Sequence, residues 1–330
     1  MKKNFLLVLL AVILVTVLAV PVFAADKKPG DYKIVLILPG FINDQSWNAT
    51  NYAGLVKCNT SLGTNIEYVE NVQAADYEST FRNYAERGYD MIMAAGTQFD
   101  DAANNVAADY PNTTFCVVNG YKSTGANVAP IFPREYEASY VAALIAGNVT
   151  ENGHFATIGG FSNEAMEHLL SVYEKTAISI ATDRGIKDAK ADRAYANSWD
   201  DVALGKQMAE QMIDNGADTM FVYANSVGLG SIQGTAEKGK KFIGFSGDQT
   251  TVDPKTVVAS VVFDFETFYS WAVQQYLDGK LAGNMVHEAG INEGIFKPVY
   301  TENVSKDVQD YVAKKIDEYK AGGVDLTKLF

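Results

Sequence analysis

Short, unbroken apolar runs alternate along the chain with segments whose apolar positions recur at helical spacing. The first group of such segments predicts strands at 33–38, 66–69, 91–95 and 114–118 and helices at 46–58, 77–86 and 99–109. The second group predicts strands at 155–158, 189–194, 219–223 and 241–245 and helices at 137–147, 165–184 and 201–215. Continuous apolar strands separated by helices are typical of a parallel sheet covered on both faces. The sequence therefore predicts an α/β fold with two doubly wound parallel-sheet lobes.

The order of the elements changes after the second group. A strand at 257–262 is followed by a helix at 266–278, a short strand at 297–300 and a last helix at 305–320. This order predicts that the chain crosses between the lobes near 132–136, 261–264 and 288–291. Several crossings of this kind form a hinge. We expect an N-terminal lobe of residues 31–132 and 263–288 and a C-terminal lobe of residues 133–262 and 289–330.

The N-terminus has the pattern of an export signal. Lys2 and Lys3 precede an apolar run at 5–20, and small residues allow cleavage after Ala24. We therefore expect residues 1–24 to be a signal peptide and the protein to be exported, to the periplasm or another extracytoplasmic location. No cysteine follows the apolar run, so the pattern does not indicate a lipid anchor.

Charge and composition narrow the classes of partner. The formal net charge of −13 argues against nucleic acid and anionic membranes as partners. Cys58 and Cys116 lie in apolar patterns, which favours buried free thiols over a disulfide. The histidines His154, His168 and His287 are scattered without ligand spacing, so we expect no metal site and no cofactor.

Polar residues follow the predicted strands of the first lobe, where a ligand site of an open α/β sheet is expected. The segment 39–48 follows the first strand and contains Asn43, Asp44 and Trp47; Gln98 follows the third strand. We predict that Trp47 faces the cleft between the lobes. The alternative is that Asp44 caps the helix while Trp47 packs inward.

The second lobe repeats this arrangement at 197–201, where Trp199 precedes a helix. Two of the three tryptophans thus occupy equivalent loop positions, one in each lobe, whereas Trp271 has the spacing of a core residue. Two indole rings from opposing lobes, here called the two-indole clamp, would stack on a flat heterocycle. The alternative is that Ser198 and Asp201 form only a capping box.

Two further strand ends of the second lobe carry polar residues. The segment 224–230 contains Asn225 and glycines that allow a close backbone approach and a sharp turn, and 246–249 contains Ser246 and Asp248. Asp248 accepts a hydrogen bond from a ligand in one interpretation and from its own turn in the other. The glycine spacing at 228–234 differs from the dinucleotide fingerprint, which disfavours a dinucleotide-binding fold.

From about residue 31 to the last helix, the chain resembles the basic-membrane-protein family of solute-binding proteins. These are purine-nucleoside-receptor-like components of ABC importers. The resemblance rests on the segments Gly40 to Asn48, Ser198 to Asp201, Gly216 to Asp218 and Ile243 to Gln249. It implies a type I periplasmic-binding fold that closes on its ligand and delivers it to a membrane permease. It also places the family's aromatic clamp at Trp47 and Trp199 and its base-recognising positions at Asn43, Asp44 and Gln98.

Two departures from the family pattern affect the expected ligand. Members that bind nucleosides usually have an acid where this chain has Ser246 and a lysine where it has Phe263 or Asp264. Both groups are expected to hold ribose hydroxyls, so we favour a free purine base, with a purine nucleoside as the alternative. A sensor subunit and a sugar-binding protein of the same fold remain alternatives. We expect a monomer. We also expect that the protein is not an enzyme, because the histidines lie outside the predicted cleft loops.

Overall fold

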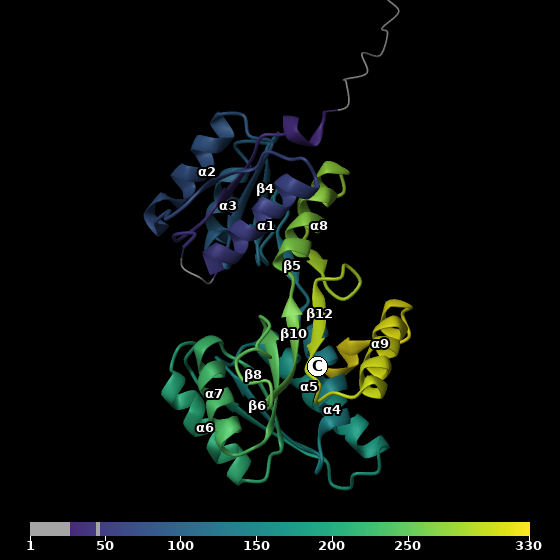
Figure 1. Cartoon of the computed structure of the whole chain (residues 1–330). Coiled ribbons are helices and arrows are strands. Elements are labelled where there is room, and N and C mark those ends of the chain that lie inside the picture. The colour runs from purple at the N-terminus through teal and green to yellow at the C-terminus, as the bar shows by residue number, and fades with distance from the viewer. Residues whose placement is uncertain (1–26, 44–46) are drawn as a thin grey trace, which may run out of the picture.

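The computed structural model describes residues 27–43 and 47–330 and shows two α/β lobes joined by several strands (Figure 1). The expected signal peptide at 1–24 and the predicted ligand residue Asp44 lie outside the described residues. Within the described ranges, no helix has both the length and the apolar character needed to cross a membrane. The predicted fold class is confirmed, because each lobe is built on a six-stranded and mainly parallel sheet.

The first lobe has a sheet with the strand order β11-β5-β4-β3-β1-β2, paired in parallel throughout. Its strands are β1 (Ile34–Ile37), β2 (Glu67–Val69), β3 (Met91–Ala95), β4 (Thr114–Val118), β5 (Ile131–Pro133) and β11 (His287–Ala289). Its helices are α1 (Trp47–Ser61), α2 (Tyr77–Glu86), α3 (Asp100–Ala107) and α8 (Phe265–Leu277). Alternate residues of β1 enter opposite cores, with Leu36 on one face and Val35 on the other. Both faces of the sheet are therefore buried, as the unbroken apolar runs predict.

The second lobe has the strand order β12-β10-β9-β8-β6-β7. Its strands are β6 (His154–Gly159), β7 (Lys190–Tyr195), β8 (Thr219–Tyr223), β9 (Lys241–Ser246), β10 (Val257–Phe263) and β12 (Phe296–Tyr300). Its helices are α4 (Glu135–Val149), α5 (Glu164–Asp183), α6 (Val202–Asp214), α7 (Asn225–Glu237) and α9 (Lys306–Lys320). Short 3-10 helices cover Pro29–Asp31, Ala74–Asp76, Thr97–Phe99 and Leu326–Leu329. The strand β12 runs antiparallel to β10, which the sequence pattern did not predict.

The helix α7 corrects the prediction of a glycine turn at 224–230. Its glycines allow the predicted close backbone approach, here against α6, but they form no turn. A Cβ at Gly230 would lie 1.8 Å from the carbonyl oxygen of Val202, and a Cβ at Gly205 would lie 2.1 Å from that of Val227. The two helices thus meet backbone to backbone. This tertiary contact outweighs the low helix propensity of glycine, which a local pattern does not reveal.

The two predicted thiols are confirmed as free and buried. Burial raises the pKa of the Cys58 thiol to about 12 and also raises the pKa of the Cys116 thiol. Both side chains lie in the core of the first lobe, so they act there as small apolar groups.

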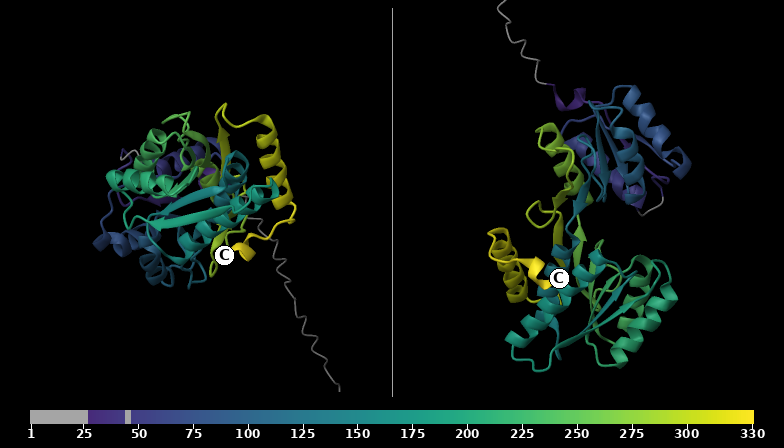
Figure 2. Two further views of the ribbon diagram at one scale, coloured as in Figure 1. Left: turned by 90° about the horizontal axis from the view of Figure 1, so that it is seen from below. Right: turned by 180° about the vertical axis from the view of Figure 1, so that it is seen from behind.

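The chain passes between the sheets three times, from β5 to α4, from β10 to α8 and from β11 to β12, and these segments run side by side between the lobes (Figures 1 and 2). Glu137, which is fully buried, ties the first and the third of these segments together. Its carboxylate pairs with Arg134 and accepts hydrogen bonds from the Ile291 amide and the Tyr319 hydroxyl. Arg134 also donates to Glu293 at 3.0 Å. The cluster links the segments around β5 and β11 to α9.

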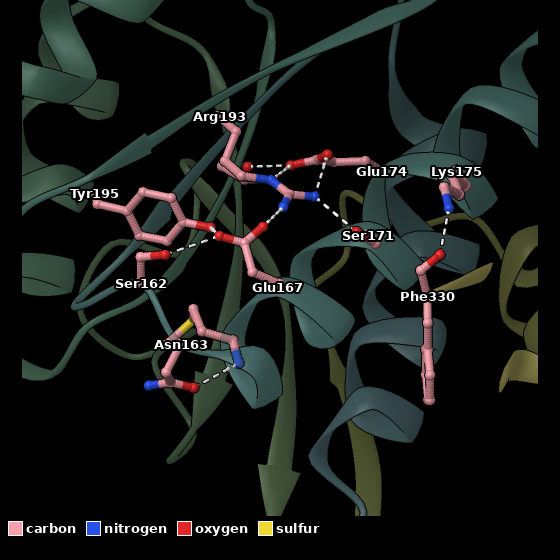
Figure 3. Close-up of polar contacts among 11 residues, drawn as sticks. Ser162, Asn163, Glu167, Ser171, Glu174, Lys175, Arg193, Tyr195 and Phe330 are labelled. Carbon is pink, nitrogen blue, oxygen red and sulfur yellow. Dashed lines mark hydrogen bonds and ion pairs between the residues drawn. The ribbon is translucent and has the colours of Figure 1, made fainter.

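A second polar cluster fastens α5 to the edge strand β7 (Figure 3). Arg193 of β7 binds Glu174 at 2.7 Å and also pairs with Glu167. Tyr195, at the end of β7, donates its hydroxyl to the same Glu167 carboxylate. The cluster therefore fixes the end of the strand that leads into the loop of Trp199.

Candidate functional site

A cleft of about 650 Å³ lies where the carboxyl ends of strands from both sheets face each other. Ligands of open α/β sheets bind at this edge. The lining residues include Trp47, Thr50 and Asn119 from the first lobe, Glu135, Phe263 and Phe265 from the crossing segments, and Asp200, Tyr223, Asn225, Phe245, Ser246 and Gln249 from the second lobe. We take this cleft as the candidate ligand site.

Trp47 lines the cleft from the first turn of α1. Its indole Nε1 donates to the carbonyl oxygen of Ala95, at the end of β3, at 3.0 Å. Its ring meets Phe265 edge to face, with a centroid distance of 5.6 Å and an interplanar angle of 89°. The polar atom of the indole is thus satisfied within its own lobe, and the ring is held at the wall of the cleft.

Further aromatic rings line the cleft beside and opposite Trp47. Phe263 and Phe265 pack at 4.1 Å between ring centroids in the crossing segment, and Tyr223 and Phe245 pack at 4.8 Å in the second lobe. Phe263 is one of the two positions at which the family resemblance leads us to expect a lysine. The structure thus has an apolar ring where a cation is expected, and the cleft has flat apolar surfaces on both sides.

Trp199 does not belong to the residues that line this cleft. Its ring packs on Gly160, where a Cβ would lie 2.3 Å from the indole, and against Phe161 at 5.5 Å between centroids. The structure therefore brings one of the two predicted indoles into the cleft and places the other against its own lobe. The two-indole clamp stays a prediction for a closed form.

The other predicted ligand residues are divided in the same way. Asn225, at the start of α7, and Ser246, at the end of β9, line the cleft. Asn43 is exposed and lies outside the lining, as does Gln98, whose amide folds over Gly96.

Asp248 follows the turn interpretation in this structure. Its Oδ1 accepts hydrogen bonds from the Thr250 amide at 3.0 Å and from the Thr250 hydroxyl at 2.6 Å. Asp248 does not line the cleft, whereas Gln249, the next residue, does. The carboxylate therefore shapes the turn that presents its neighbour.

Glu135 is an acidic residue of the cleft that the sequence analysis missed. It begins α4, directly after the crossing strand β5, and shares a hydrogen bond with the Tyr223 hydroxyl. Burial raises the pKa of Glu135 to about 7, although the Tyr223 hydrogen bond acts in the opposite direction. The segment was interpreted only as a hinge, but an acid at a helix start after a strand is the same signal that drew attention to 39–48.

Asn119 was also missed, and its geometry points to a ligand contact. It follows β4 in a left-handed conformation with φ of 61°, and Ser246 has a φ of 75°. Non-glycine residues in this conformation are uncommon and cluster at ligand sites. Among the described residues, the Asn119 Oδ1 atom is buried and has no hydrogen-bond partner. It is an acceptor that a bound donor would satisfy.

Charge further limits the ligand. Glu135 and Asp200 are the charged residues that line the cleft within the described part of the chain, so its lining holds acids without a lysine or arginine. Such a lining favours neutral or cationic ligands over phosphorylated ones.

The profile of the ABC transporter substrate-binding protein PnrA-like family matches residues 32–324 of this sequence. The chain belongs to this family. Individual relatives agree with the assignment. The chain is 24% identical over 299 residues to the ABC transporter nucleoside-binding protein BmpA of Lactococcus lactis, covering 83% of this chain and 82% of that protein.

Solved structures show the same fold as this PnrA-like protein. A solute-binding protein of an ABC transporter system from Aeropyrum pernix aligns with a TM-score of 0.68 and 19% identity, covering 89% of this chain and 92% of that chain. A transcriptional activator of the comK gene from Bacillus halodurans aligns with a TM-score of 0.76 and 17% identity, covering 88% and 99%. At this level of identity the likeness is one of fold.

The family assignment establishes the general role of the PnrA-like chain. It is a solute-binding protein of an ABC transporter, a class that binds a small molecule outside the cytoplasm and presents it to a permease. Proteins of this class are not enzymes.

Proposed function

We propose that this protein captures a flat purine-type heterocycle, with a free purine base preferred over a purine nucleoside. The observation that carries this proposal is the aromatic lining of the cleft, in which Trp47 and Phe265 lie on one wall and Tyr223 and Phe245 on the other. Stacking between a base and an aromatic side chain contributes about 1–3 kcal/mol per base. Flat apolar walls therefore suit a planar heterocycle better than a flexible, strongly hydrated ligand.

Polar atoms at the rim of these walls suit the edge of a purine. The Glu135 carboxylate accepts from a ring N–H or an amino group, and the unpaired Oδ1 of Asn119 accepts a second donor. Asn225 offers both a donor and an acceptor. A ligand that leaves such a buried group unpaired loses about 1–3 kcal/mol of binding free energy, so these groups select ligands by their donor pattern.

The preference for a base rests on two positions that line the cleft. Phe263 offers no donor to a ribose hydroxyl, and Ser246 carries no charge. The nucleoside is the second candidate for two reasons. The Lactococcus lactis relative is a nucleoside-binding protein, and Glu135 supplies a carboxylate that accepts from hydroxyl groups as well as from N–H groups.

In the proposed mechanism, the lobes rotate about the crossing segments and close on the stacked ring. The two-indole clamp belongs to this closed form, in which Trp199 would approach the ligand from the second lobe. The closed protein then delivers the purine to a membrane permease of an ABC transporter. We propose that it acts as a monomer that is exported by the signal at 1–24.

Isothermal titration calorimetry with adenine, guanine, hypoxanthine, their ribonucleosides, ribose and glucose tests the proposal. We expect purine bases to bind with a dissociation constant of about 1 μM or below, nucleosides more weakly, and sugars without measurable heat. Binding of a sugar but no purine would overturn the proposal. Nucleosides that bind more tightly than every base would replace the first candidate by the second.

The variants Phe263→Lys and Ser246→Asp provide matched tests of the base preference. Each restores a group that the family resemblance assigns to ribose, so each should improve nucleoside affinity relative to base. Ser226→Asp serves as a control for charge alone, because Ser226 also lines the cleft. An equal gain in Ser246→Asp and Ser226→Asp would mean that the added negative charge, and not its position, sets the preference.

A further inference from the structure

Asn51, on α1, is fully buried and makes two side-chain hydrogen bonds that link the cleft to a distant segment. Its Nδ2 donates to the carbonyl oxygen of Trp47 at 2.7 Å. Its Oδ1 accepts from the Tyr269 hydroxyl at 2.6 Å. A buried amide that uses both of its polar ends has a fixed orientation, so Asn51 transmits the position of Tyr269 to the first residue of α1.

Tyr269 is held as firmly as Asn51. It is fully buried on α8, and its ring packs so closely on Gly54 that a Cβ there would lie 2.5 Å away. Phe265, four residues earlier on the same helix face, makes the edge-to-face contact with the Trp47 ring. The helix α8 thus contacts Trp47 twice, directly through Phe265 and indirectly through Asn51.

The helix α8 also begins next to the hinge. Phe265 comes two residues after Phe263, the last residue of the crossing strand β10, and both rings line the cleft. A residue at the start of a helix frays more readily than one in its middle. Trp47 begins α1, and the bond from Asn51 to its carbonyl adds an anchor at that end.

We propose that Tyr269 is a positioning residue of the ligand site, which sets the orientation of the Trp47 ring through Asn51. Its effect on affinity rests on the proposed function, whereas its effect on Trp47 does not. Tyr269 itself touches no ligand, because it is buried between α8 and α1 and does not line the cleft.

The variant Tyr269→Phe removes the hydroxyl and keeps the ring. Its matched control is Tyr173→Phe, since Tyr173 is also fully buried and its hydroxyl has no hydrogen-bond partner among the described residues. Protein labelled with 5-fluorotryptophan gives one ¹⁹F signal for each indole, assigned with single Trp→Phe variants. In Tyr269→Phe we expect the Trp47 signal to shift or broaden while that of Trp199 stays in place. Tyr173→Phe should leave both signals unchanged.

Affinity for the tightest purine is the second measurement. We expect Tyr269→Phe to weaken binding by about three- to tenfold, equivalent to about 0.7–1.4 kcal/mol, and Tyr173→Phe to leave it unchanged. Asn51→Leu should weaken binding similarly. Because both residues act through one connection, adding Tyr269→Phe to Asn51→Leu should cause no further loss.

The outcomes separate the two proposals. If the wild type binds no purine, the proposed function fails, but the ¹⁹F spectra still test the connection to Trp47. A folded Tyr269→Phe variant with an unshifted Trp47 signal would overturn the inference, whatever the ligand. Additive losses in the double variant would also overturn it, because they would show that Asn51 and Tyr269 act separately.

Discussion

Glu135→Gln is the substitution that tests the candidate site most directly. Glu135 begins α4 at the wall of the cleft, and burial raises the pKa of its carboxyl from 4.5 to about 7. The unfolded chain keeps the ordinary value. Between these two values the folded protein binds more protons than the unfolded chain does, so the stabilisation from protonated Glu135 is complete below pH 4.5 and is lost as the pH rises through 7. Glutamine keeps the shape and removes the titration.

The magnitude follows from the size of the shift. One pKa unit corresponds to about 1.4 kcal/mol, so the difference between 4.5 and about 7 sets an upper bound of about 3.5 kcal/mol. Glu135 is partly open to the cleft, and water there screens the charge. We therefore expect Glu135→Gln to gain about 1–2 kcal/mol on the wild type between pH 4.5 and pH 8.

Urea unfolding of both proteins across this pH range measures the effect. Burial also raises the pKa of Asp100, to about 6. Asp100 therefore lowers the stability of both proteins equally as the pH rises, so only the difference between the two proteins reports on Glu135. The same variant should lose purine affinity, as expected where a charged group serves binding at the expense of stability. Parallel stability curves together with unchanged affinity would refute the role given to Glu135.

Three further substitutions and one chemical modification have definite expected outcomes. Trp47→Ala should weaken purine binding tenfold or more in calorimetry. An equal loss in Trp199→Ala would establish the two-indole clamp. If Trp199→Ala instead lowers only the melting temperature, the result would fit the packing of Trp199 on its own lobe. Glu137→Ala should lower the free energy of unfolding by about 3–5 kcal/mol, because it removes the buried partner of Arg134 and leaves the Ile291 amide and the Tyr319 hydroxyl without their acceptor. A urea titration that shows a loss below about 1 kcal/mol would contradict the role given to Glu137. Cys58 and Cys116 should react with iodoacetamide only after unfolding, because they are buried and their thiol pKa values are raised; mass spectrometry that finds either one alkylated in the native protein would contradict this.

The sequence predicts the parts of the fold that depend on local pattern. The strands β3 and β4 begin and end at the predicted residues, because each is an unbroken apolar run between polar segments. The helix α7 was missed because its glycines contact a second helix, and that contact depends on the tertiary arrangement. The antiparallel direction of β12 was missed for a similar reason, since a strand of five residues carries no sign of its orientation.

The candidate site was predicted less completely than the fold. Trp47, Asn225 and Ser246 line the cleft because each lies at or after the carboxyl end of a strand. Trp199 also follows a strand, but its ring packs on Gly160, which has no side chain to prevent this contact. Glu135 and Asn119 follow strands as well and were passed over, because spacing alone does not reveal which strand ends lie together.

The bond between Asn51 and Tyr269 joins residues that are 218 positions apart, and this has a consequence for biosynthesis. A ribosome completes most of the second lobe before it makes α8 and β11, the last pieces of the first. Until then the side of α1 that α8 will cover stays in contact with water, and contacts of such long sequence separation form slowly. The nascent chain should therefore attract chaperones through its earliest helix, long after that helix has emerged.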